Sequence, residues 1–133
     1  MEKNNWYIVR TKSNKEKNVA ERLTNESQKG DLMGKISEVI VPTEHILYHR
    51  SGKKVKREKI LFPGYVFVNT NSVAEIKPFI QMMSETLGFL KDRSGNITPV
   101  SQREIDRVYK LMEESSERDL DVNIKTGDEV LVI

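Results

Sequence analysis

The stretch ILFPGYVFV, residues 60–68, decides the fold of this chain. It follows the charged run KKVKREK at 53–59, and each of its residues is apolar, aromatic, Pro or Gly. An apolar run with little alternation is typical of a strand that is buried on both faces. We therefore expect a central strand over 65–68, with Phe67 and Val68 in the core.

Pro63 and Gly64 interrupt this stretch and predict a change in chain direction. Proline removes a backbone donor that a strand needs, and glycine allows a bend or a close backbone approach. Together they are expected to end one strand and to turn the chain into the next. The bend can bring Phe62 and Tyr65 onto a surface, where clustered aromatics are unfavourable unless a partner covers them. Burial in the core is the alternative, and the residues alone leave both interpretations open.

Upstream, the sequence predicts a strand, a helix, a second strand and a hairpin. Residues 6–9 are β-prone. Ser13 and Glu16 match a capping box, and the apolar spacing that follows predicts a helix over 14–27. A strand at 36–41 ends before Pro42. Residues 46–49 and 54–60 flank the turn RSGK and predict a projecting β-hairpin.

Downstream, the sequence predicts two more helices joined by short extended segments. Pro78 is tolerated in the first turn of a helix but not in its interior, so a helix is expected over 77–83. An extended stretch at 87–90, a turn at 92–96 and a short strand at 97–99 follow. Ser101 and Glu104 form a second capping box, and the apolar stripe behind it predicts a helix as far as Met112.

This order of elements predicts an α+β fold. We expect a single mixed or antiparallel sheet with helices packed on it, in a ferredoxin-like arrangement with a projecting hairpin. The length of 133 residues allows one compact domain and a fragment of a second. The chain has no cysteine, which excludes disulfides, a thiolate nucleophile and a Cys-based zinc site.

The charge is distributed unevenly along the chain. Residues 1–60 hold 14 Lys and Arg against 8 Asp and Glu, a balance of +6, and residues 61–133 hold 8 against 12, a balance of −4. This asymmetry indicates a basic face that suits an acidic partner or nucleic acid. The alternative is two ordinary solvated surfaces. No apolar run approaches the roughly 20 residues of a membrane span, and no signal-peptide core is present. A soluble, cytoplasmic protein with no membrane contact is expected.

Several separated motifs converge on one family. WYIVRT near the N-terminus, EVIVPTE at 38–44, the FPGYVFV run, GFL at 88–90, TPVSQREID at 98–106 and TGDEVLVI at the end stand in its order and spacing. The chain resembles the N-terminal (NGN) domain of the NusG family of bacterial transcription elongation factors. The resemblance implies an NGN domain over 1–113, a linker over 114–124 and the first strand of a KOW domain over 125–133. The chain is therefore expected to be either a fragment of a longer protein or a natural short form.

The resemblance also implies a function without catalysis, metal or cofactor. Members of the family bind RNA polymerase at the clamp helices of its largest subunit, bridge the cleft to the gate region of the opposing subunit and close over the DNA of the elongation complex. They thereby modulate pausing, processivity, termination and antitermination. A complete KOW domain recruits Rho or a ribosomal protein. A monomer is expected.

The residues expected to act fall into two sets. The resemblance implies polymerase contacts at Trp6, Tyr7, Ile60, Phe62, Pro63, Gly64 and Tyr65. The second set is expected to contact nucleic acid and comprises Lys12, Lys15, Arg50, Lys53, Lys54, Lys56, Arg57, Met82 and Met83, with Lys17 and Lys59 beside them. Basic residues without interleaved aromatics predict phosphate contact and not base readout, and a solvated hairpin is the alternative.

A few residues argue against a metal site or depart from the pattern of the family. His45 and His49 share a face, but no ligand constellation accompanies them, so no metal site is expected. Where family members that pause at particular sequences carry a polar pair, this chain carries Met82 and Met83, which cannot make the same hydrogen bonds. Lys91 stands where the family often has Gly after GFL.

Three alternatives to a general elongation factor stay open. The first is an operon-specific antiterminator paralog. The second is a basic protein that binds free nucleic acid without polymerase, for which a steep salt dependence is the test. The third and weakest is a phosphate-handling enzyme of ferredoxin-like fold, for which no catalytic constellation is found in the sequence.

Overall fold

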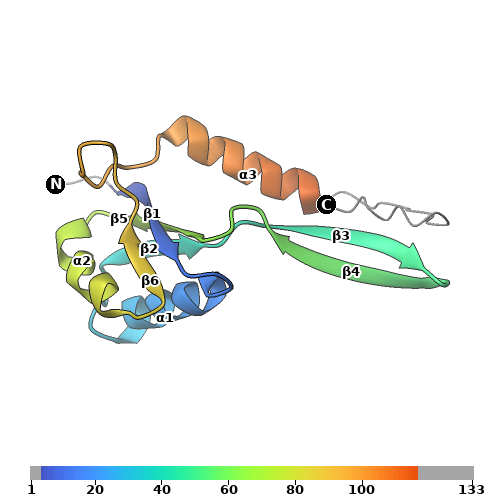
Figure 1. Ribbon diagram of the computed structural model, residues 1–133, viewed down its shortest axis with the longest axis horizontal. Helices are drawn as coiled ribbons and strands as arrows, with labels where there is room; N and C mark the ends of the chain where they lie inside the picture. The colour runs from blue at the N-terminus through green and yellow to red at the C-terminus, as the bar shows by residue number, and fades with distance from the viewer. Residues whose placement is uncertain (1–3, 117–133) are drawn as a thin grey trace. The chain divides into compact units, whose positions relative to one another are not determined.

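The computed structural model describes residues 4–116 of the chain. Contacts divide the chain into two compact units, one holding the residues up to Val41 with Phe62–Ile105, the other holding Pro42–Leu61 and the chain from Asp106. The elements, drawn in Figure 1, are β1 Asn5–Thr11, α1 Glu16–Lys29, β2 Ile36–Ile40, β3 Thr43–Arg50, β4 Lys53–Ile60, β5 Tyr65–Thr70, α2 Val73–Met82, β6 Thr86–Phe89 and α3 Gln102–Ser116.

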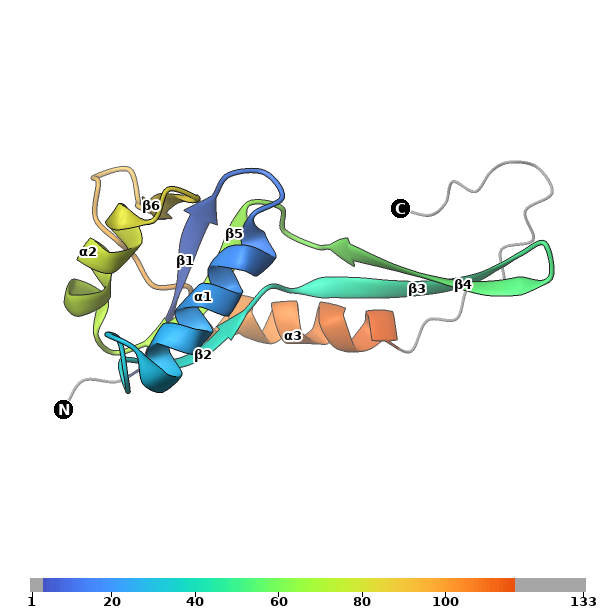
Figure 2. The same ribbon diagram turned by 90° about the horizontal axis from the view of Figure 1, so that it is seen from below.

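The first unit confirms the predicted α+β fold. Its four strands form one sheet in the order β2-β5-β1-β6, and every neighbouring pair is antiparallel. With α1 between β1 and β2, and α2 between β5 and β6, this is the ferredoxin-like arrangement. Figures 1 and 2 show α1 and α2 on the same side of this sheet.

The central strand β5 is buried on both faces, as its apolar run predicts. Val66 and Val68 lie on the helix-covered face, where they belong to one core cluster with residues of α1 and α2. Phe67 points to the opposite face and is only 3 % exposed. The core members contributed by the two helices are Val19, Leu23, Ile76 and Ile80.

Helix α2 differs from the prediction. It begins at Val73 and contains Pro78 in its interior, whereas the sequence predicted a start at 77 with the proline in the first turn. An interior proline costs about 3 kcal/mol because it removes one helical hydrogen bond. Ile76 and Ile80 on either side of it are fully buried, and burial of one such side chain contributes about 1.5–3 kcal/mol. Packing on the sheet therefore offsets the local penalty.

The hairpin β3–β4 forms a two-stranded sheet of its own, longer than predicted. Its strands pair without interruption from Thr43 opposite Ile60 to Arg50 opposite Lys53. Ser51 and Gly52 form the turn with φ values of 54° and 78°, which is the two-residue hairpin turn with positive φ at both positions. Since this turn matches the twist of the strands, the ladder continues to the tip.

Helix α3 begins as predicted and ends later. The Ser101 hydroxyl oxygen accepts the Glu104 N–H at 3.2 Å, and Ile105 and Val108 are buried. The helix continues to Ser116, so the first residues of the predicted linker are helical. The predicted strand at 97–99 reduces to one bridge between Lys91 and Ile97. The rest of the predicted linker and the KOW-like strand at 125–133 lie outside the described residues.

The predicted turn at 92–96 is organised by the Asp92 carboxylate. Its Oδ1 accepts the N–H groups of Ser94 and Asn96 at 2.8 and 2.9 Å, and its Oδ2 accepts the Thr98 hydroxyl at 3.1 Å. The hydrogen bond from the Asn96 backbone, followed by weaker ones, lowers the pKa of Asp92 below its ordinary value.

We expect an NMR pH titration to give Asp92 a midpoint below the ordinary aspartate pKa of about 3.9. Because the pKa is lower in the folded chain, its contribution to stability is present above that ordinary value and is lost as the pH falls through the folded-state pKa. A midpoint at or above the ordinary value would contradict the hydrogen bonding of this turn.

Candidate functional site

The FPGY segment, Phe62–Tyr65, forms a tight turn between the hairpin and β5. The Tyr65 N–H donates to the Phe62 carbonyl at 3.1 Å, and Gly64 has φ +84°. Proline at the second position and glycine with positive φ at the third define a type II turn. The sequence prediction of a Pro-Gly break is confirmed, since β4 ends at Ile60 and β5 begins at Tyr65.

The Gly64 residue of this turn is held from both sides by the start of the chain. Its carbonyl accepts the Thr11 N–H from the end of β1 at 2.8 Å. Its N–H donates to the Glu16 carboxylate at 2.6 Å, and the Glu16 side chain is buried. Three elements, β1, α1 and β5, therefore meet at the turn.

This contact also corrects the prediction for the start of α1. The helix begins at Glu16, and its N-cap, Lys15, makes no side-chain capping bond. Asn14 has φ +64°, so the chain turns sharply just before the helix. Glu16 therefore does not close a capping box with Ser13, because its carboxylate bonds to Gly64 instead.

The strand register places Tyr65 on the sheet face opposite α1 and α2. Tyr65 alternates with Val66 and stands directly across from Arg10 of β1. Phe62 packs edge-on against Phe67, which lies on the same face, with ring centroids 5.8 Å apart. Phe62 and Tyr65 are half-buried, and Pro63 and Arg10 are exposed. We call Arg10, Phe62, Pro63 and Tyr65 the FPGY face.

Two residues predicted to join this surface do not lie on it. Tyr7 stands opposite Val68 in the register, packs on the core cluster and makes an edge-on contact with Phe89 at 6.1 Å. It therefore lies on the helix-covered side of the sheet. Trp6 is on the correct side but is only 7 % exposed. Face alternation thus separates Tyr7 from the FPGY face, whereas burial is what withdraws Trp6 from it.

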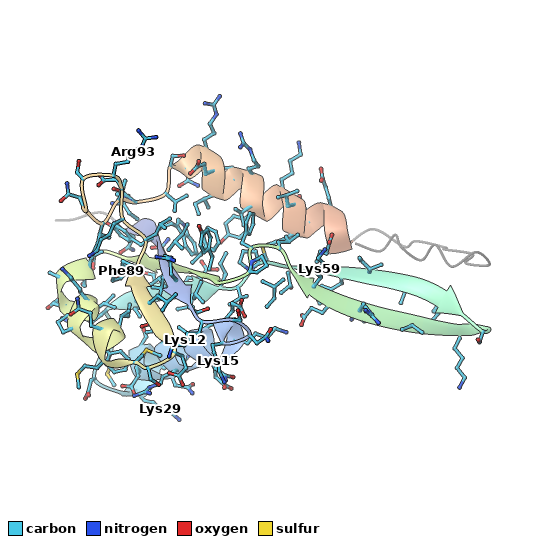
Figure 3. All side chains as sticks on the ribbon, viewed as in Figure 1. Lys12, Lys15, Lys29, Lys59, Phe89 and Arg93 are labelled. Atoms are coloured by element: carbon cyan, nitrogen blue, oxygen red, sulfur yellow. The ribbon has the colours of Figure 1, made fainter. Side chains whose placement is uncertain are left out.

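The remaining predicted contacts are spread over several elements. Met83 is 4 % exposed and belongs to the core, so it cannot serve as a nucleic-acid contact, whereas Met82 is 85 % exposed. Ile60 is the half-buried last residue of β4. Lys12 and Lys15 are exposed in the connection from β1 to α1 (Figure 3). The other basic residues follow the hairpin: Arg50 ends β3, and Lys53, Lys54, Lys56, Arg57 and Lys59 lie along β4 with exposed side chains.

Sequence reasoning missed Arg10 and Glu16. Arg10 could have been found by assuming that β1 pairs with β5, because period-two alternation then separates Trp6, Ile8 and Arg10 from Tyr7. No sequence pattern indicates the contact of Glu16 with Gly64, since 48 residues separate them.

Replacing Gly64 with alanine is expected to destabilise the protein by about 1–2 kcal/mol. A β-carbon at this position would lie 3.6 Å from the Thr11 carbonyl oxygen, an ordinary contact, so the positive φ and not a clash sets the penalty. Asparagine tolerates this conformation better, and Gly64→Asn should lose less stability. Urea unfolding of both variants tests this, and equal stability of Gly64→Ala and the wild type would contradict it.

Two further features bear on the class of site. Over residues 4–116, no group of three or more His, Asp or Glu side chains is placed to hold a metal ion. None of the described helices is long and apolar enough to span a membrane.

Known proteins share this sequence and fold. The family model NusG, described as transcription termination factor nusG, matches residues 4–109. The transcription termination/antitermination protein NusG of Pasteurella multocida is 33 % identical over 116 residues, which are 87 % of this chain and 63 % of that protein. The NusG protein of Neisseria meningitidis is 31 % identical and is matched over 96 % of this chain and 72 % of its own length.

Solved structures agree with this result. The structure titled "Domain interaction in Thermotoga maritima NusG" aligns with a TM-score of 0.63 and 25 % identity, over 95 % of this chain and 70 % of that one. The N-terminal domain of NusG (NGN) from Methanocaldococcus jannaschii has the same fold, with a TM-score of 0.50 over 77 % of this chain and 98 % of the domain.

The length of the match shows how much of the family's proteins this chain corresponds to. The chain spans 63 % of the Pasteurella multocida relative, and the family match ends at residue 109. A match over residues 4–109, together with the ferredoxin-like sheet, shows that the chain belongs to the NusG family of transcription factors and carries its N-terminal domain.

Proposed function

We propose that this chain binds RNA polymerase through the FPGY face and acts as a non-enzymatic transcription elongation factor. The observation that supports this most is the FPGY turn itself. It is fixed by backbone hydrogen bonds from Tyr65 and Thr11 and by the bond from the Gly64 N–H to the Glu16 carboxylate. It nevertheless leaves aromatic side chains half-exposed beside an exposed proline. Rigid aromatics at a surface are typical hot spots of protein interfaces.

The partner surface that suits this face is helical and carries carboxylates. Phe62 and Tyr65 offer apolar anchors of the kind that the stripe of an amphipathic helix buries. Arg10 stands beside Tyr65 and makes no side-chain hydrogen bond or ion pair within the part of the chain that the structure describes. It is thus available for a bidentate bond to a carboxylate. The clamp helices of the largest polymerase subunit are the partner we propose.

The basic residues of the hairpin support a second contact, with phosphates of the DNA in the elongation complex. Lys53, Lys54, Lys56 and Arg57 are exposed and form no ion pair with any side chain that the structure describes. In the strand register, Lys53 stands opposite Arg50 at the tip of the hairpin. Lys12 and Lys15 are proposed to add to this contact.

A variant with alanine at Lys53, Lys54, Lys56 and Arg57 is expected to bind the elongation complex more weakly and with less dependence on salt. Removing one interaction with a phosphate lowers the slope of log K against log salt by about 0.9. Removing all four would therefore reduce the slope by roughly 3–4. A variant with alanine at Lys29, an exposed lysine of α1, is the control. An unchanged slope would show that the hairpin is only solvated.

Binding of the wild-type chain to core RNA polymerase, with and without a nucleic-acid scaffold, tests the proposal. Measurable affinity for core polymerase without nucleic acid is the expected result. The alternative, a protein that acts on free nucleic acid, predicts the reverse: tight and salt-sensitive binding to bare DNA or RNA, and none to core polymerase.

The consequences for transcription follow from this binding and are part of the same proposal. A domain that bridges the polymerase clamp and the gate region of the opposing subunit would keep the cleft closed on DNA and alter pausing, termination and antitermination, in the cytoplasm and as a monomer. We further propose that residues 125–133 begin a KOW domain. Rho or a ribosomal protein would then be recruited only by a chain with that domain complete.

A further inference from the structure

Glu16 is the residue through which α1 reaches the FPGY turn. Its carboxylate lies 2.6 Å from the Gly64 nitrogen, and its side chain is only 3 % exposed. A buried carboxylate is unfavourable unless it is hydrogen-bonded. This one stands in the first turn of a helix, where the helix dipole favours negative charge, and it accepts a backbone N–H. The buried carboxylate therefore keeps this hydrogen bond only while the Gly64 N–H points toward it.

This hydrogen bond selects between two forms of the turn. Types I and II differ by a flip of the central peptide, and type II alone needs a positive φ at the third position. Here the central peptide joins Pro63 to Gly64, and its N–H is the group that Glu16 accepts. A flip to type I would turn this N–H away from the carboxylate. The observed φ of +84° at Gly64 agrees with the form that Glu16 favours.

The form of the turn determines how the FPGY face is presented. Phe62 and Tyr65 are the first and last residues of the turn, and the Tyr65 N–H closes it on the Phe62 carbonyl. Glycine has wide conformational freedom, so Gly64 does not hold the type II form by itself. The Thr11 N–H bonds to the Gly64 carbonyl, which lies beyond the central peptide. Glu16 is thus the side chain that fixes the peptide plane.

We propose that Glu16 is a positioning residue for partner binding: it holds the Pro63–Gly64 peptide in the type II orientation and so pre-organises Phe62 and Tyr65. This inference rests on the proposed function. If the competent form of the turn is populated only in part, the apparent affinity falls by that fraction. A drop of the type II population to about a tenth would weaken binding about tenfold.

The test combines three variants with two measurements. Glu16→Ala removes the acceptor, Glu16→Gln keeps an oxygen acceptor without the charge, and Glu21→Ala removes an exposed glutamate from the same helix as a control. We expect faster hydrogen exchange of the Gly64 amide and about tenfold weaker binding to core RNA polymerase in Glu16→Ala. Glu16→Gln should fall between it and the wild type, because a neutral acceptor forms a weaker bond. Glu21→Ala should match the wild type in both.

The outcomes separate this inference from the proposed function. Gly64 exchange that is unchanged in Glu16→Ala would overturn the hydrogen-bond assignment, and wild-type affinity with faster exchange would overturn the positioning role. If Glu16→Ala does not fold, Glu16→Gln decides by the same two criteria. If the wild-type chain does not bind core polymerase, the proposed function and the positioning role for binding both fail, and the exchange measurement still decides whether Glu16 holds the turn.

Discussion

Replacing Tyr65 with alanine is expected to weaken binding to core RNA polymerase by about 30-fold or more, with the fold intact. An aromatic hot spot contributes about 2 kcal/mol or more to an interface, which corresponds to that factor. Tyr65 lies on the sheet face opposite the core cluster and is half-buried, so its removal leaves no cavity in that cluster. Phe62→Ala should weaken binding comparably, with a larger loss of stability, because its ring packs on Phe67.

Fluorescence anisotropy of the labelled chain against core polymerase measures this, and circular dichroism checks the fold. Met33→Ala is the matched control, since it removes a side chain that is apolar and 60 % exposed from the connection between α1 and β2. If Tyr65→Ala and Phe62→Ala bind as tightly as Met33→Ala, the FPGY face is not the docking surface. If both variants unfold, the two aromatics are structural and the site assignment is wrong.

The second large effect is expected at Tyr7, and it should appear in stability. Tyr7→Ala is expected to lower the free energy of unfolding by about 2–3 kcal/mol, because it removes a ring that packs on the core cluster and edge-on against Phe89. Urea unfolding measures the decrease. At a temperature where the variant stays folded, its affinity for polymerase should remain within about twofold of the wild type.

The Tyr7→Ala experiment would distinguish two placements of Tyr7, one on the polymerase-binding surface and one against the core. The family resemblance implies that Tyr7 contacts polymerase, whereas the register places it behind the sheet with Val9. A stable Tyr7→Ala variant that no longer binds would support the resemblance and contradict the register. A destabilised variant that still binds would confirm the placement seen in the structure.

The regular elements of the fold could be predicted because local patterns determine them. The apolar run of β5, the Pro-Gly break before it and the N-cap at Ser101 all act over a few residues, and each is confirmed. The start of α2 could not be predicted, since Pro78 is a strong local signal for a helix start and only the burial of Ile76 and Ile80 overrides it.

The candidate site could be predicted only in part from the sequence, because some of its contacts join residues that are far apart in the chain. Phe62 and Tyr65 lie in the motif itself, so their proximity follows from the turn. The strand register decides which residues of β1 lie beside the turn. Arg10 is identified only once it is known to pair with Tyr65. Glu16 matches a local capping pattern but bonds across 48 residues. A local pattern cannot distinguish a cap from a long-range acceptor.

Site-specific cross-linking tests the central claim most directly. The chain contains no cysteine, so Lys12→Cys can carry a single photo-activated cross-linker. Lys12 is exposed and follows Thr11, whose N–H bonds to Gly64. We predict a cross-link from position 12 to the clamp helices of the largest polymerase subunit, and none from a Glu21→Cys control. Absence of a polymerase cross-link from position 12, or equal cross-linking from both positions, would contradict docking through the FPGY face.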